Sequence, residues 1–304
     1  LFFLHADAAN PDAQESRGLG DVYKRQAGKL GIGFTDNNVK IGSTALDALT
    51  TGTNNTAVGS ASLTATTTGA RNVAVGYESL LNLTTGDDNT ALGTGALNAC
   101  TTASDNVAVG RNALVSNTTG NNHAVVGATA GDANTTGVNL TAIGFNAAGA
   151  NTTGDNNTAV GKDALASSTT ATNLVAVGAF ALKQNTGSNN TAVGLSALEL
   201  NTTGAQNTAV GSQALDANTT ASNNTAVGYE SSTTNTTGAS NTSVGRRSLK
   251  LNTTGSNNVA IGQNCLESNT TADNNTAVGK SALEQNTTGT SNVAVGAYAL
   301  DANT

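Results

Sequence analysis

Aliphatic and small residues recur at fixed positions along most of this chain. The residue two before a recurring glycine is Ala in thirteen copies, and the third residue after that glycine is always Ala, Ser or Cys. The position after that is Leu in thirteen copies. Self-similarity at a short, fixed period indicates an array of stacked units. The glycine itself follows an aliphatic residue in sixteen places, 17 residues apart except for one interval of 16, at Gly42, Gly59, Gly76, Gly93, Gly110, Gly127, Gly144, Gly161, Gly178, Gly194, Gly211, Gly228, Gly245, Gly262, Gly279 and Gly296.

Each copy predicts one short strand, made of the three residues before the glycine, such as residues 56–58. A period of 17 is too short for two-helix repeats, and the Asn-Thr-Thr-Gly loops would interrupt a helix in every copy. The pattern therefore predicts an all-β, parallel β-solenoid of about sixteen coils. Equivalent glycines such as Gly211 and Gly228 should stack in parallel register. The short copy before Gly194 should be absorbed in its loop without a shift of the strand.

The repeat also predicts which way the strand side chains point. Side chains alternate between the two faces of a strand, so Thr56 and Val58 share one face and Ala57 takes the other. We expect the Val column to point inward with Leu, and the Ala column to point outward. An outward strip that stays small and apolar on nearly every coil indicates a partner surface. The candidates for an oligomer interface are the alanines of this column, Ala57, Ala74, Ala91, Ala108, Ala159, Ala209 and Ala277.

Two further columns consist mainly of Asn. The strand-entry column directly precedes each strand and includes Asn55 and Asn72, whereas the loop column opens the NTTG loops and includes Asn117 and Asn134. Stacked Asn side chains can hydrogen-bond along the axis as ladders. No coil of this composition would be stable alone, so its neighbours must supply stability. His123 replaces Asn in the strand-entry column, and we interpret it as a polar substitute in the ladder rather than a metal ligand.

The composition narrows the functional classes. Charged residues make up 11% of the chain and the net charge is −7, which leaves no basic surface for a nucleic acid. No apolar run reaches the length that spans a bilayer, so we expect no membrane insertion by this segment. Cys100 and Cys265 lie about ten coils apart and cannot form a disulfide framework, and Cys265 is expected to be a buried thiol. No catalytic or metal-binding set recurs in register, so we predict no enzymatic activity, no cofactor and no metal site.

Residues 1–26 form a non-repeat segment that shares no column with the array. A secretory leader is one interpretation of its apolar start, Leu1 to Leu4. We favour another, because the stretch RGLGDVYKRQ is typical of translated sequencing-adapter read-through. We therefore expect residues 1–26 to be non-native and disordered and residues 27–304 to form the repeat array. We also expect the natural protein to extend beyond both ends.

The repeated phrases NTAVG, NVAVG, NVAIG and LTAIG, each followed by a small residue three places on, carry a family resemblance. They resemble the head repeats of trimeric autotransporter adhesins (YadA-like heads), and are more similar still to the NTAVG-x-x-AL arrays of phage and bacterial tail-fibre proteins. The resemblance covers residues 38–304, although this repeat is a few residues longer than that of most such heads. It implies a left-handed β-roll in a homotrimer, an extracellular location at a cell surface or on a virion, and a structural and adhesive role as a rigid spacer and surface binder. A host-surface glycan or a matrix protein would be its partner.

The first, second, fifth and sixth positions after the glycine vary among copies and are expected to face solvent. Free drift on a solvated surface is one explanation of this variation. The other is receptor contact, because Tyr and Arg are the residue types that anchor interfaces. The surface-binding candidates are Tyr77, Phe145, Tyr229, Arg246, Arg247 and Tyr298.

Two other functions remain open. The Thr pairs of the loops, such as Thr118-Thr119, Thr135-Thr136 and Thr202-Thr203, could form the flat array of an ice-binding solenoid. The seventeen N-x-S/T sequons could instead carry a row of glycans along the NTTG edge of a secreted structural filament. A chain this rich in Asn and Thr contains sequons by composition alone.

Overall fold

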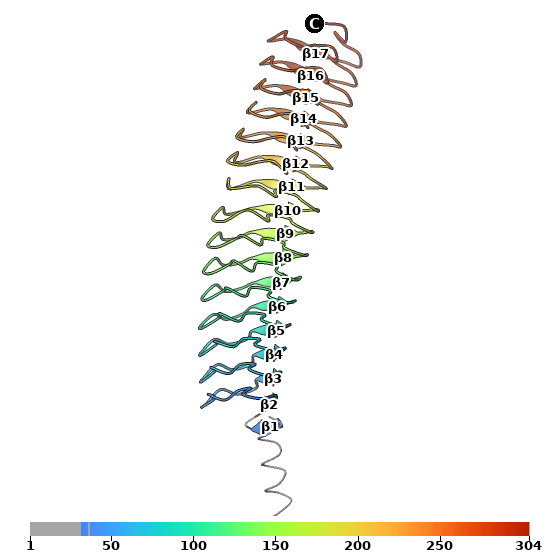
Figure 1. Ribbon diagram of the computed structural model, residues 1–304. Helices are drawn as coiled ribbons and strands as arrows, with labels where there is room; N and C mark the ends of the chain where they lie inside the picture. The colour runs from blue at the N-terminus through green and yellow to red at the C-terminus, as the bar shows by residue number, and fades with distance from the viewer. Residues whose placement is uncertain (1–31, 36, 304) are drawn as a thin grey trace, which may run out of the picture.

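The computed structural model describes residues 32–35 and 37–303, so the expectations for residues 1–26 lie outside the described residues. It shows a rod of stacked coils, each of which contributes one strand to a single long sheet (Figure 1). The strands are β1 (Ile32–Thr35), β2 (Asn38–Ile41), β3 (Thr56–Val58), β4 (Val73–Val75), β5 (Thr90–Leu92), β6 (Val107–Val109), β7 (Ala124–Val126), β8 (Thr141–Ile143), β9 (Thr158–Val160), β10 (Val175–Val177), β11 (Thr191–Val193), β12 (Thr208–Val210), β13 (Thr225–Val227), β14 (Thr242–Val244), β15 (Val259–Ile261), β16 (Thr276–Val278) and β17 (Val293–Val295).

The strands from β2 to β17 run parallel, and each pairs with the next in identical register. The predicted parallel β-solenoid is therefore confirmed. The short copy also behaves as predicted, because Ala192 of β11 lies between Ala176 of β10 and Ala209 of β12 without a shift. Figure 1 shows the rod changing direction in this region, near β10 and β11. The pattern did not predict β1, which pairs antiparallel with β2 at the start of the described sheet.

The assignment of strand faces to the inside and outside of the rod was wrong. Ala57, Ala74 and their equivalents are fully buried, whereas the aliphatic residue that precedes each repeat glycine is half-buried or exposed. The interior is filled by the Ala column from the strand and by the small residue and the Leu that follow the glycine. A 17-residue coil encloses so narrow a space that the Leu side chain needs a small residue opposite it. Val125, which stands at the Ala position, is fully buried in a coil where Gly131 replaces the Leu, so a larger residue on one side is matched by a smaller one on the other.

Tight turns bring the chain back beneath each strand. Gly76 has φ +138°, and a Cβ atom at this position would lie 2.6 Å from the carbonyl oxygen of Gly93 on the next coil. The second and fourth residues after the glycine, Glu78 and Leu80 in this coil, are also left-handed, with φ of 56° and 50°. Left-handed geometry costs an L-residue roughly 1–2 kcal/mol. Contacts between coils must offset this cost in every repeat.

Both predicted Asn ladders are present. In the strand-entry column, the Oδ1 atom of Asn55 accepts the backbone N–H of Asn72 at 2.9 Å, and its Nδ2 atom donates to the carbonyl of Gly69 at 2.8 Å. In the loop column, the Nδ2 atom of Asn134 donates to the Oδ1 atom of Asn117 at 2.9 Å. These side chains are fully buried, and their bonds satisfy backbone groups that the short strands leave unpaired.

The apolar interior is interrupted once, between Ala226 and Leu249. Ser232 stands here in place of the usual Leu, and Ser243 in place of the strand Ala. The Oγ atom of Ser243 lies 2.8 Å from that of Ser232 and 2.7 Å from that of Ser231. Hydrogen-bonded hydroxyls thus replace apolar contacts in this part of the rod.

Candidate binding surfaces

The outward side of the sheet is an apolar strip that follows the rod axis. Of the three strand residues before each repeat glycine, the first and the third point outward. They form two columns side by side, which we call the sheet face. The third position is Val, Ile or Leu in all sixteen parallel strands, and Val126, Ile143 and Ile261 are 42%, 43% and 40% exposed. The first position is Thr in nine strands and Val or Ala in the others, mostly half-buried. Sequence reasoning missed this surface because it placed the Val column inside.

The predicted interface alanines do not lie on a surface. The seven residues are completely buried within one chain, so they cannot contact a partner in the folded coil, and the prediction fails for the same steric reason as the face assignment. The apolar strip that they were expected to form does exist, one residue away in the sequence, on the sheet face. They are Ala57, Ala74, Ala91, Ala108, Ala159, Ala209 and Ala277.

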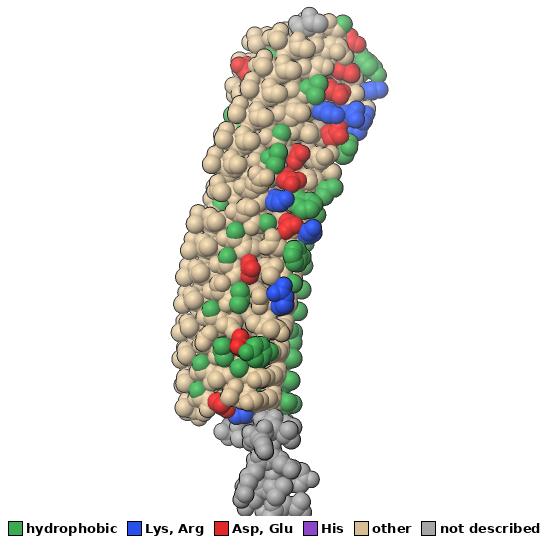
Figure 2. Space-filling model, viewed as in Figure 1, with side chains coloured by type: hydrophobic (Ala, Val, Ile, Leu, Met, Phe, Trp, Pro, Cys, Tyr) green, Lys and Arg blue, Asp and Glu red, His purple; other side chains and the backbone are tan. Residues whose placement is uncertain are grey.

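A second distinct surface runs along the residues directly after the repeat glycines, which we call the crest. None of its sixteen residues is acidic, although Asp and Glu outnumber Lys and Arg by 20 to 13 in the chain. Figure 2 shows charged and hydrophobic side chains gathered along one side of the rod, beside a broad surface of uncharged polar residues. The large crest residues are all exposed, and they are Tyr77, Arg111, Phe145, Lys162, Leu195, Tyr229, Arg246 and Lys280.

Four of the six predicted surface-binding residues lie on the crest, and Arg247 and Tyr298 lie beside it in the second position after the glycine. The structure brings Tyr229, Arg246 and Arg247 together on neighbouring coils. It leaves Tyr77, Phe145 and Tyr298 apart along the rod. Tyr77, Phe145, Tyr229 and Tyr298 are about half exposed, as expected for solvent-facing positions.

The group around Tyr229 is held by a charged network that sequence reasoning missed. The Glu230 carboxylate accepts from the Lys250 ammonium at 2.8 Å and from the Arg247 Nε atom at 3.0 Å. Lys250, the Tyr229 hydroxyl and Arg247 lower the pKa of Glu230 to about 2. The hydrogen bond to Glu230 in turn raises the pKa of Tyr229. The neighbouring Arg246 forms no ion pair within the described residues.

Cation–π contacts order two other parts of this side of the rod. The Lys162 and Lys183 ammonium groups lie 5.5 Å and 5.0 Å from the centre of the Phe180 ring. The Lys280 ammonium lies 5.2 Å from the Tyr298 ring on the next coil. The Lys162–Phe180 and Lys280–Tyr298 contacts join residues of successive coils, whereas Lys183 and Phe180 lie in the same coil.

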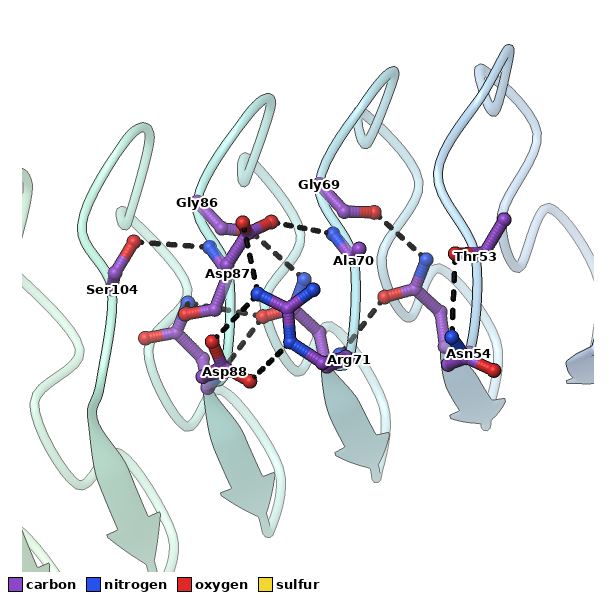
Figure 3. Close-up of polar contacts among 12 residues, drawn as sticks. Thr53, Asn54, Gly69, Ala70, Arg71, Gly86, Asp87, Asp88 and Ser104 are labelled. Carbon is purple, nitrogen blue, oxygen red and sulfur yellow. Dashed lines mark hydrogen bonds and ion pairs between the residues drawn. The ribbon is translucent and has the colours of Figure 1, made fainter.

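The largest polar cluster on the loop edge is at the other end of the strands (Figure 3). The Arg71 guanidinium donates to both oxygens of Asp88, at 2.6 Å and 2.8 Å, and to Asp87 at 3.1 Å. Asp87 also accepts the Ala70 backbone N–H at 2.8 Å. Asp88 raises the pKa of Arg71, and Arg71 lowers the pKa of Asp88. One guanidinium pairs with two carboxylates, so the cluster joins coils and leaves no cation free for an anionic ligand.

The Thr pairs of the loops are divided between two roles. The first Thr of each pair is bonded to the next coil, as when the Thr118 Oγ1 atom donates to the carbonyl of Thr135 at 3.0 Å. The second Thr, such as Thr119, is exposed. Only one of each pair therefore presents its hydroxyl to solvent, which halves the array expected for an ice-binding face.

The NTTG sequons do not offer their Asn side chains to solvent. Asn117 and Asn134 are fully buried in the loop ladder, and the Nδ2 atom that a glycan would modify donates to carbonyl oxygens there. The Asn of the NTTG sequons is therefore not an accessible acceptor in the folded coils. Exposed sequon Asn residues do lie on the loop edge in the column of Arg71, at Asn54, Asn139, Asn156, Asn189, Asn223 and Asn274, and Asn82 is exposed in another column.

His123 and the cysteines belong to the interior. The His123 Nδ1 atom accepts the Leu140 backbone N–H at 3.1 Å, as an Asn Oδ1 atom does in other coils, which confirms the ladder interpretation. Burial lowers the pKa of His123 to about 4, so the ring is neutral at pH 7. Cys265 is a buried thiol, as predicted, and Cys100 is buried as well. Burial raises the pKa of both thiols to about 11.

Within the described coils we find no pocket, and no group of three or more His, Cys, Asp or Glu residues that could hold a metal ion. None of the described segments forms a helix with the length and apolarity needed to cross a membrane. No protein-family model matches the chain, and neither a curated protein nor a solved structure matches it. The surfaces of the rod are therefore the basis for a functional proposal.

Proposed function

We propose that the array is a segment of an extracellular structural and adhesive fibre, in which copies of the chain associate side by side through the sheet face. The observation that supports this proposal is the continuity of the exposed aliphatic column, which is unbroken from Ile41 to Val295. Monomeric proteins rarely expose a contiguous apolar patch of more than roughly 300–600 Å².

The sheet face offers a long contact surface. Sixteen strands at about 4.8 Å span roughly 75 Å, and two outward columns with their flanks are about 10 Å wide. The footprint is thus of the order of 750 Å² per chain, which a homotrimer divides between two neighbouring chains. The homotrimer, its left-handed coils and its place at a cell surface or on a virion follow from the resemblance to adhesin heads and tail fibres.

The oligomeric mass of the purified chain, measured by light scattering, tests this proposal. We expect a trimer for the parent. The double variant Val193→Lys/Val210→Lys places two charges on the sheet face of adjacent coils, so its mass should fall towards that of a monomer while its circular dichroism is unchanged. The matched control, Thr203→Lys/Thr220→Lys, adds the same charges to exposed loop positions of the same coils. A monomeric parent at high micromolar concentration, or equal effects of the two variants, would show that the sheet face does not mediate assembly.

A further inference from the structure

The crest combines two kinds of side chain in a repeated order. Phe145 is followed on the next coil by Lys162, and Tyr229 is followed on the next coil by Arg246. Successive coils are about 4.8 Å apart along the axis. Each pair therefore places an exposed aromatic ring and an exposed cation side by side along the rod.

We infer that the crest binds an extended acidic polysaccharide, with sugar rings against Phe145 and Tyr229 and carboxylates against Lys162 and Arg246. This inference rests on the proposed adhesive function and names its ligand. An aromatic ring packs against the apolar face of a pyranose, and a guanidinium or ammonium pairs with a carboxylate. One sugar unit in an extended chain advances by about one coil spacing, so the ring and the acid of a uronate polymer match the aromatic and the cation of neighbouring coils.

Of the two pairs, Tyr229–Arg246 is the better suited to bind a carboxylate, because its cation has no ion-pair partner among the described residues. Glu230, which is held by Lys250 and Arg247, interacts with the Tyr229 hydroxyl and raises its pKa, so a charged network stands beside the exposed ring before a ligand arrives. Arg246 is exposed and forms no ion pair among the described residues, so a carboxylate would not have to displace a partner.

Carboxylates beside the crest oppose the binding of any polyanion, so the crest side chains have to supply the affinity. Glu230, Glu267 and Glu284 lie in the second and fifth positions after the glycine, next to the crest. A uronate polymer carries one carboxylate on every sugar and a nucleic acid one phosphate on every nucleotide, so these carboxylates and the net charge of −7 repel both. A comparison with poly(dT) therefore tests whether the crest distinguishes a uronate polymer from another polyanion.

Binding of polygalacturonate to the parent chain tests the inference, with fully methyl-esterified polygalacturonate and poly(dT) as comparison ligands. We expect polygalacturonate to bind, the neutral ester to bind at least about tenfold more weakly, and the affinity to fall as salt rises. Arg246→Gln and Tyr229→Ala should each weaken binding about tenfold, while Tyr229→Phe, which keeps the ring, should stay within about threefold of the parent. Arg71→Gln removes the same charge from the loop edge and should leave the affinity unchanged.

Several results would overturn the inference. They are an absence of polygalacturonate binding, equal binding of the methyl ester, tighter binding of poly(dT), or equal effects of Arg71→Gln and Arg246→Gln. Mass measured on the same samples separates this inference from the assembly proposal. A trimer that does not bind polygalacturonate refutes the ligand alone, and a monomer that binds it refutes the assembly alone.

Discussion

Replacing one Asn of the strand-entry ladder should open the rod locally at a defined place. Asn224 accepts the backbone N–H of Asn241 at 2.9 Å through its Oδ1 atom, and its Nδ2 atom donates to the carbonyl of Gly238 at 2.9 Å. Asn224→Ala removes both bonds. It leaves the buried Asn241 N–H without a partner, whereas the Gly238 carbonyl keeps its bond from the Nδ2 atom of Asn235 at 2.9 Å. The unpaired group costs about 1–3 kcal/mol and the other lost bond about 0.5–1.5 kcal/mol, so the expected loss is about 1.5–4.5 kcal/mol.

The repeat itself supplies a graded comparison. Leu occupies the same column at Leu140 and Leu174, where it is fully buried. Asn224→Leu loses the same hydrogen bonds as Asn224→Ala, but it fills the space and buries an apolar side chain worth roughly 1.5–3 kcal/mol. We therefore expect the Leu variant to be destabilised less than the Ala variant.

Amide hydrogen exchange at Asn241 measures this effect where it arises, because an array of coils need not unfold in one step. A loss of about 2 kcal/mol corresponds to roughly 30-fold faster exchange, and larger losses scale accordingly. Asn223→Ser is the matched control. It changes the exposed neighbouring residue to the Ser that stands at the equivalent left-handed position, Ser240. Exchange at Asn241 that stays within twofold of the parent in Asn224→Ala would refute the role assigned to the ladder.

Two other substitutions probe the interior. His123 has a pKa of about 4 in the folded chain against 6.5 for a free His, so folding favours the neutral ring. The free energy of unfolding should therefore fall by about 3 kcal/mol as the pH drops from above 6.5 to about 4. The stability difference between the parent and His123→Asn, followed by denaturant titration against pH, should show this loss; a flat difference would contradict it. Ser243→Ala alone should lower the melting temperature because it strands the Ser232 hydroxyl, whereas Ser232→Leu/Ser243→Ala should raise it by restoring the usual apolar pair, worth about 1–3 kcal/mol. Equal melting temperatures for the two variants would count against this account of the polar interruption.

Much of the fold could be predicted because the period and the glycines leave few alternatives. A 17-residue period with one three-residue strand gives a coil, and identical phrases such as those ending at Gly211 and Gly228 must stack in register. The ladders follow from Asn columns in the same way, and His123 was placed correctly because its ring nitrogen can substitute for an amide oxygen. These features depend on residue spacing and on hydrogen-bonding capacity, both of which can be derived from the amino-acid sequence.

The inside and the outside of the coil could not be predicted from the same columns. Alternation shows that Ala57 and Val58 face opposite ways, but it does not show which way is inward. The usual preference for burying the larger residue gave the wrong answer, because left-handed turns at residues such as Glu78 and Leu80 narrow the coil until a small residue such as Ala is needed opposite Leu. Non-glycine residues carry no clear signal for such turns. The charged network around Glu230 was missed for a related reason, since its members come from two coils and different columns.

The contrast between two outward positions of one strand bears on whether the sheet face is covered. The first position is Thr in nine of the sixteen parallel strands, which shows that Thr fits an outward place on this sheet. The third position is never Thr and is always Val, Ile or Leu. Strand propensity alone does not separate these types, because Thr and Val are both β-branched and both favoured in strands. The crest lies only two residues after the third strand position, and polar and charged residues occur there in many copies. A column exposed to water would accept Thr at least as well as its neighbour does, so the unbroken aliphatic column supports the proposal that the sheet face is covered by another copy of the chain.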